Sequence, residues 1–210
     1  MRPLAIALLV LALSFAALTR PAQRAAASNS SLPQSAGTPP SASPALLQPA
    51  PAIQSLIHAL EGNWATHEKY EPLFMTPHGG IGTGMQIFRS GPGGFTLLEN
   101  YHSKTPAGEL FGTGIIWWDQ TASQLQHLWC INVYPDGCEM FPPPPQPGPR
   151  WDGKTLSIHI VSDQAGKRMV WDEAISDITA ASFTQTASIA EGDSPSHLWF
   201  TSHAVRRSQP

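Results

Sequence analysis

Aromatic residues recur two positions away from ionisable residues in several segments of this chain. Side chains two positions apart in an extended strand point to the same face of a sheet. If these segments are strands around one interior, the spacing predicts an aromatic pocket that contains two carboxyl groups and two imidazoles. Apolar walls with a few polar groups are typical of small-molecule sites. The predicted lining is Glu99, Tyr101, His127, Trp129, Trp171, Glu173 and His203.

Trp117 and Trp118 are adjacent in the sequence, so a strand must turn their rings to opposite faces. We expect one ring to line the interior and the other to lie outside, and we place Trp117 with the candidate pocket. The alternative to an open cavity is a core that the aromatic rings simply fill. A single β-bulge would turn any of these strands over and change its lining.

Three functions are compatible with such a pocket. The first is non-catalytic binding of a small apolar or amphipathic molecule, for which no cofactor is predicted. The second is haem or metal binding, with His127 and His203 as first candidates, although no paired histidine spacing supports a closed metal site. The third is an enzyme that uses Glu99 or Glu173 as a general base, with a pKa raised by a dry pocket. A role in envelope interactions is a further alternative.

The elements that must position these residues are short strands that follow one helix. Ile53, Leu56, Ile57 and Leu60 recur at helical spacing and predict a short amphipathic helix that ends at Gly62. After it the apolar period changes to two, and turn residues separate the strand patterns at hairpin length. The predicted strands are 64–70, 85–90, 95–102, 110–119, 125–134, 138–141, 155–162, 168–176, 182–190 and 197–205.

These strands predict an all-β fold. No helical pattern lies between them, so parallel βαβ architecture is excluded, and a long meander curls to remove its edges. We expect an antiparallel up-and-down barrel or half-barrel of about 9–10 strands with a short N-terminal helix. The segment His78 to Gly84, rich in glycine, lacks the lysine and the following helix of a phosphate site, and is read as a flexible loop or barrel lid.

Two sets of motifs carry a resemblance. Gly62-Asn63-Trp64 at the start of the first strand resembles the opening of lipocalin-type (calycin) barrels, which implies that Trp64 closes one end against a C-terminal basic residue, Arg206 or Arg207. The middle segment is similar to an uncharacterised bacterial family of lipocalin-like domains of unknown function, over most of residues 60–190. That resemblance implies a fold and no settled activity. Its motifs are Leu97-Leu98-Glu99-Asn100-Tyr101, Phe111-Gly112-x-Gly114, Trp118-Asp119, Leu125, Trp129, Trp151-Asp152-Gly153 and Trp171-Asp172-Glu173.

The N-terminal residues have the order of an export signal. A single arginine precedes an apolar run from Leu4 to Leu18, and small residues follow, which predicts a signal peptide over residues 1–27. The run is shorter than a permanent membrane span, so no stable span is expected after its removal, although an uncleaved anchor is the alternative. Residues 28–52 have the composition of a disordered Ser/Pro/Ala-rich linker, and residues 53–207 form the predicted barrel domain. We therefore expect an exported, periplasmic or secreted bacterial protein.

Charge restricts the class of partner, and the cysteines are compatible with export. The first 52 residues hold three of the twelve basic residues and none of the fifteen acidic ones, so the predicted domain has a net charge of about −6. This balance argues against nucleic acid as a partner. Cys130 and Cys138 flank the turn signal Tyr134-Pro135-Asp136-Gly137 and are expected to form a disulfide across a hairpin. Two buried free thiols are the alternative.

Overall fold

The computed structural model describes residues 47–133, 137–141, 147–164 and 166–208. The predicted signal peptide, most of the predicted linker and most of the proline-rich segment 142–147 lie outside the described residues. The helix α1 (Pro51–Leu60) begins inside the range predicted as linker, with proline in its first turn. Its apolar face is buried through Ile53, Leu56, Ile57 and Leu60. In the described part of the chain, no helix is both long and apolar enough to span a bilayer.

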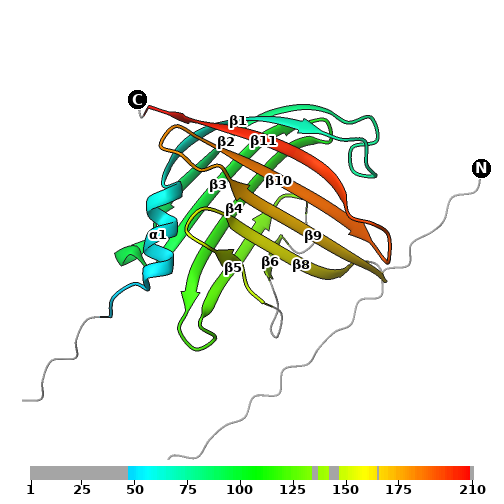
Figure 1. Ribbon diagram of the computed structural model, residues 1–210. Coiled ribbons are helices and arrows are strands. Elements are labelled where there is room, and N and C mark those ends of the chain that lie inside the picture. Colours follow the sequence, from blue (N-terminus) through cyan, green and yellow to red (C-terminus); the bar gives the residue numbers. More distant parts are fainter. Residues whose placement is uncertain (1–46, 134–136, 142–146, 165, 209–210) are drawn as a thin grey trace, which may run out of the picture. The chain divides into compact units, whose positions relative to one another are not determined.

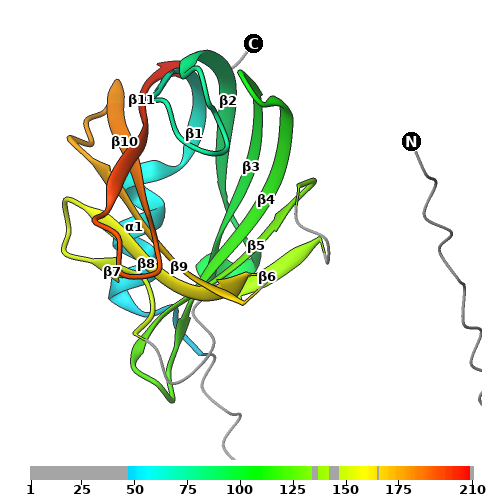
Figure 2. The same cartoon turned by 90° about the vertical axis from the view of Figure 1, so that its right-hand side faces the viewer.

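The strands form one antiparallel sheet, and the predicted all-β half-barrel is confirmed (Figure 1). The sheet order is β6-β5-β4-β3-β2-β1-β11-β10-β9-β8-β7, so consecutive strands are neighbours and β1 pairs with β11. Figure 2 shows the sheet curled around an interior, with β1–β4 on one side and β8–β10 on the other. The strands are β1 (Gly62–Tyr70), β2 (Gly80–Ser90), β3 (Thr96–Thr105), β4 (Gly108–Asp119), β5 (Gln124–Ile131), β6 (Cys138–Phe141), β7 (Arg150–Trp151), β8 (Leu156–Gln164), β9 (Lys167–Ser176), β10 (Ser182–Glu191) and β11 (His197–Arg207); a short 3-10 turn, η1 (Pro92–Gly94), joins β2 to β3.

The helix covers one end of this interior and forms an apolar floor with inward-facing residues that lie near this end of most strands. Trp64 is fully buried there and packs edge-on against Phe183, with ring centroids 4.8 Å apart. Its indole Nε1 donates a 2.8 Å hydrogen bond to the carbonyl oxygen of Leu60, one of the last carbonyls of α1. The other buried residues of this floor are Ile53, Leu56, Ile57, Leu60, Phe88, Leu97, Ile116, Leu125, Leu156, Ile158, Ile175 and Ala204.

Arg206 lies over the outer side of this floor. Its guanidinium carbon is 4.1 Å from the centroid of the Trp64 ring, and the same group donates hydrogen bonds to the carbonyl oxygens of Glu61 and Ala180. The pairing of β1 with β11 sets Trp64 directly opposite Arg206 and Asn63 opposite Arg207, whose side chain is exposed. Of the two candidate arginines, Arg206 is therefore the one in contact with Trp64.

Two local expectations are corrected. The glycine-rich segment is not a loop throughout, because β2 begins at Gly80 and includes Gly82 and Gly84. A Cβ on Gly82 would lie 2.7 Å from a carboxyl oxygen of Glu68 and 2.9 Å from the Tyr70 ring, so glycine makes room for side chains of β1. The second correction is the strand β7, a two-residue strand that pairs with β8 and had no sequence signal of its own.

Cys130 on β5 and Cys138 on β6 are directly opposite each other and form a disulfide. The bond joins β6, an edge strand of the sheet, to the neighbouring strand. Three of the residues in the predicted turn between the cysteines, 134–136, lie outside the described part of the chain.

Candidate functional site

The interior above the apolar floor holds a cavity of about 380 Å³. This volume lies at the lower end of the range found for small-molecule pockets. Its wall is rich in aromatic rings, several of which touch each other: Trp171 and Trp199 meet edge-on with centroids 5.1 Å apart, and Tyr101 and Trp129 have centroids 6.3 Å apart. The aromatic lining consists of Tyr70, Tyr101, Trp129, Trp171, Trp199 and Phe200.

A continuous chain of hydrogen bonds crosses the cavity at its deep end. Gln86 donates through Nε2 to Glu99 at 3.0 Å and to Gln185 at 2.9 Å. Gln185 in turn donates to Glu173 at 2.8 Å, and the indole of Trp171 donates to the other oxygen of Glu173 at 3.3 Å. We call Gln86, Glu99, His127, Glu173 and Gln185 the polar row, because strand register places all five just above the apolar floor.

His127 is the member of the polar row that lacks hydrogen bonds. Its side chain is 6% exposed, it lines the cavity, and neither ring nitrogen has a hydrogen-bond partner among the described residues. Gly114 lies opposite Glu99 across β3 and β4, and a Cβ on Gly114 would lie 3.2 Å from Nε2 of His127. Because Gly114 has no side chain, the imidazole of His127 can lie close to β4, the strand between β5 and β3, which carries Glu99.

Burial favours the neutral forms of the titratable residues in the polar row. Desolvation, together with the charge of Glu173, raises the pKa of Glu99 to about 8, although the hydrogen bond from Gln86 acts in the opposite direction. Desolvation also raises the pKa of Glu173, against the hydrogen bonds from Gln185 and Trp171. Desolvation lowers the pKa of His127 to about 4. At neutral pH these shifts favour the uncharged imidazole of His127 and the protonated carboxyl group of Glu99.

A third acidic residue of the cavity wall, Glu68 on β1, is not among the residues predicted from the sequence. It is 2% exposed and lines the cavity. Four hydroxyl groups donate to its two oxygens, from Thr66 at 2.9 Å, Tyr101 at 3.1 Å, Tyr70 at 2.7 Å and Ser103 at 2.6 Å. Desolvation is the main cause that raises the pKa of both tyrosines, and the charge of Glu68 contributes. The alternation of β1 puts Glu68 on the same face as Trp64, and this spacing is the signal that could have found it.

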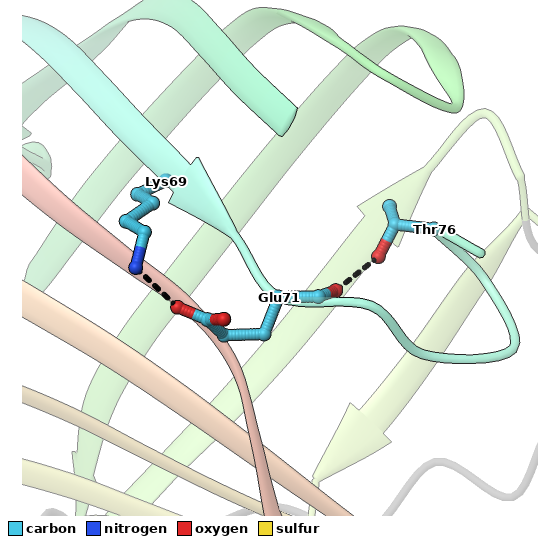
Figure 3. Close-up of polar contacts among 3 residues, drawn as sticks. All are labelled: Lys69, Glu71 and Thr76. Carbon is cyan, nitrogen blue, oxygen red and sulfur yellow. Dashed lines mark hydrogen bonds and ion pairs between the residues drawn. The ribbon is translucent and has the colours of Figure 1, made fainter. Parts of the chain in front are cut away.

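The segment between β1 and β2 closes over the other end of the cavity, where Met75 contributes to the lining. Thr76 fixes this segment, because its hydroxyl donates to the carbonyl oxygen of Glu71 at 2.9 Å and accepts from the indole of Trp199 at 3.2 Å. Figure 3 shows Glu71 between Thr76, which contacts its carbonyl, and Lys69, which pairs with its carboxylate. Thr76 is buried, so these contacts tie the segment to β11.

The structure brings six of the eight predicted pocket residues together around the cavity. They are Glu99, Tyr101, His127, Trp129, Trp171 and Glu173.

Trp117 and His203 do not line the cavity. On β4 the inward face contains Gly112, Gly114 and Ile116, which leaves Trp117 outside and packs Trp118 against the apolar floor.

His203 is turned outward by a β-bulge in β11. The pairing of β11 with β10 shifts register between Ala187 and Ser188 of β10, and Trp199 is the extra residue on β11. This bulge turns both Trp199 and Phe200 inward and moves His203 to the exposed face, so the expected inward position of His203 is wrong.

The bulge also separates the two histidines that were the first candidates for haem or metal ligands. His127 lies in the interior and His203 on the outer face, so the two histidines do not converge. Among the described residues, no group of three or more His, Cys, Asp or Glu side chains is arranged to hold a metal ion.

Comparison with known proteins gives only distant likenesses. No protein-family model matches the chain, and no curated protein matches it. Among solved structures, the chain is similar to Rv2717c from M. tuberculosis, at 13% identity and a TM-score of 0.49, over 77% of this chain and 100% of that one. EF1p2_mFAP2b bound to DFHBI gives 14% identity and a TM-score of 0.40, over 74% of this chain and 99% of that chain.

A redesigned β-barrel, mFAP1, bound to DFHBI gives 16% identity and a TM-score of 0.37, over 75% of this chain and 100% of that one. The bacterial family suggested by the sequence is therefore not established, whereas the antiparallel half-barrel is. At these identities and TM-scores, what the other proteins bind gives no argument about this chain, and its function has to be inferred from its own cavity.

Proposed function

We propose that the domain binds a small apolar or amphipathic molecule in the cavity of the half-barrel. The observation that carries this proposal is that the cavity is bounded by aromatic side chains and by a buried imidazole, that of His127, without a hydrogen-bond partner. A buried polar group with no partner costs about 1–3 kcal/mol, and a ligand in the cavity would supply the missing contact. The disulfide and the order of the N-terminal residues support binding outside the cytoplasm.

The proposal is tested with the full chain and Nile red, a neutral dye whose emission rises in an apolar site. We expect saturable binding with one site per chain. Ile160→Trp, on the cavity wall, should abolish it by filling the space, whereas Val205→Trp on the exposed face of β11 should not. Native mass spectrometry of the purified protein should also show a co-purified small molecule. The proposal fails if the dye does not bind and no molecule accompanies the protein.

A second candidate is acid-base catalysis, and the raised pKa of Glu99 favours it. A carboxyl group with a pKa of about 8 can hold and release a proton near neutral pH, as general acids and bases do. Glu99→Gln and Glu173→Gln would then lower turnover of any substrate found in an activity screen. Unchanged turnover in both variants would remove this candidate and leave binding.

A further inference from the structure

The described lining of the cavity contains three carboxyl groups and no lysine or arginine to pair with them. Its titratable side chains are Glu68, Tyr70, Glu99, Tyr101, His127 and Glu173, and neither lysine nor arginine is among its described lining residues. Glu68 makes no ion pair with any described residue. Buried charges in proteins are normally paired, because an unpaired charge in a medium of low dielectric constant is costly. The wall as it stands therefore favours a positive charge in the cavity.

The hydrogen-bonding groups of the wall point to the same chemistry. The hydroxyl groups of Tyr70 and Tyr101 donate to Glu68, and the amide of Gln86 donates to two partners within the polar row. These donors are therefore taken up by the wall itself. Acceptors remain, because Oε1 of Gln86 is buried without a partner among the described residues, and neutral His127 has one ring nitrogen with a free lone pair besides its one N–H. A molecule that carries several donors fits these acceptors.

The aromatic wall adds a third element. Trp129, Trp171 and Trp199 lie around the same space as Glu99 and Glu173. The face of an aromatic ring attracts a cation, and this attraction strengthens when the cation is removed from water. An apolar body would contact the same rings by burial of apolar surface.

We propose that the molecule bound here is a protonated amine on an apolar or aromatic body, with its ammonium group at the polar row and its body against the aromatic wall. This inference rests on the proposed binding function and names the class of ligand. The ammonium group donates to the acceptors of the polar row and takes the place of the proton on Glu99. That proton leaves to solvent, so the cavity exchanges one positive charge for another.

The test uses three molecules with one carbon skeleton: 4-phenylbutylamine, 4-phenylbutanol and 4-phenylbutyrate. Each competes with Nile red for the full chain at pH 7. We expect the amine to bind about tenfold or more tightly than the alcohol, as a charge-assisted hydrogen bond implies, and the carboxylate to bind most weakly. Calorimetry in two buffers of different ionisation enthalpy should show that the amine, but not the alcohol, releases a proton on binding.

Two variants locate the effect. Glu99→Gln should remove the proton release, and Glu99→Gln and Glu173→Gln should each reduce the ratio of amine affinity to alcohol affinity. Asp172→Asn replaces a carboxyl group one residue away, on the exposed face of β9 where it pairs with His159, and should leave the preference for the amine unchanged. Binding of Nile red reports whether each variant still folds.

Each result decides the inference. If Nile red binds but the alcohol or the carboxylate equals the amine, the proposed binding function stands and the amine assignment is overturned. An amine preference that survives in both glutamate variants also overturns it. If neither the dye nor any of the three molecules binds, the binding function itself is wrong, and the amine assignment is wrong with it.

Discussion

Gln86 and Gln185 meet across the interior of the half-barrel through a 2.9 Å hydrogen bond, although they are 99 positions apart in the sequence. Gln86 is on β2 and Gln185 on β10, and β1 and β11 lie between these strands in the sheet. Each glutamine also donates to a carboxyl group of the cavity wall, Gln86 to Glu99 and Gln185 to Glu173. The two amides therefore hold two acidic groups at the deep end of one cavity, where their protonation depends on folding.

Glu99 and His127 are expected to change the pH dependence of stability in opposite directions. Burial raises the pKa of Glu99 from 4.5 to about 8, so within this window the folded chain keeps a proton that the unfolded chain has lost. Stability then falls as pH rises. Burial lowers the pKa of His127 from 6.5 to about 4, so within this window the unfolded chain binds a proton that the folded chain does not. Stability then falls as pH falls. Each slope is at most about 1.4 kcal/mol per pH unit.

Urea unfolding at several pH values checks both signs. The free energy of unfolding of Glu99→Gln, relative to the wild type, should grow as pH rises from 4.5 to 8. That of His127→Phe, relative to the wild type, should grow as pH falls from 6.5 to 4. His203→Asn, at an exposed position on β11, serves as the control. Parallel profiles for Glu99→Gln, His127→Phe and the wild type would contradict the assigned protonation states.

The sheet could be predicted because its signals are local. Alternation of period two and hairpin-length turns set each strand, and antiparallel order follows when no long connection separates them. The position of Glu99 and Glu173 in one cavity follows from the same alternation, since their aromatic neighbours share their face. Strand positions and inward-facing residues could therefore be predicted where the alternation is regular.

The wrong and missing predictions concern features that depend on residues distant in the sequence. The bulge at Trp199 arises from the pairing of β11 with β10, and no residue near His203 signals it. Gly82 weakens the strand pattern of β2, yet β2 continues through it because the space beside it is occupied by Glu68. Glu68 itself looks like a surface residue until Tyr70, Tyr101 and Ser103 surround its carboxylate with donors.

Gly112→Ala is expected to reduce the cavity. A Cβ at this position would lie 2.5 Å from Cζ2 of Trp129, so the indole would have to move away from β4 and into the cavity. We expect a loss of stability of about 1–3 kcal/mol, as for other overpacked sites, and weaker binding of Nile red. Urea unfolding and dye titration measure the two effects. Thr113→Ala, on the exposed face of the same strand, is the matched control. Wild-type dye affinity in Gly112→Ala would show that Trp129 does not limit the cavity.

Arg206 and Arg207 are expected to differ in their contribution to stability. Arg206 contacts the Trp64 ring and donates to two carbonyl oxygens, whereas Arg207 is exposed. Arg206→Ala should lower the free energy of unfolding by about 2 kcal/mol, and Arg207→Ala by less than about 0.5 kcal/mol. Arg206→Lys should fall between them, because an ammonium group cannot reproduce the planar fork of the guanidinium. Equal losses in Arg206→Ala and Arg207→Ala, measured by urea unfolding, would remove the proposed role of Arg206 in closing this end of the barrel.

Thr76→Val is expected to loosen the segment that closes over the cavity. Valine has the shape of threonine but can neither accept from the Trp199 indole nor donate to the Glu71 carbonyl. The indole N–H is buried, and leaving it without a partner should cost about 1–3 kcal/mol. Because Met75 lies in the same segment and lines the cavity, bound Nile red should dissociate faster, which stopped-flow displacement measures. Thr76→Ser keeps the hydroxyl group and should retain the wild-type dissociation rate. If Thr76→Val also retains that rate, the dye leaves the half-barrel by a path that does not require this segment to move.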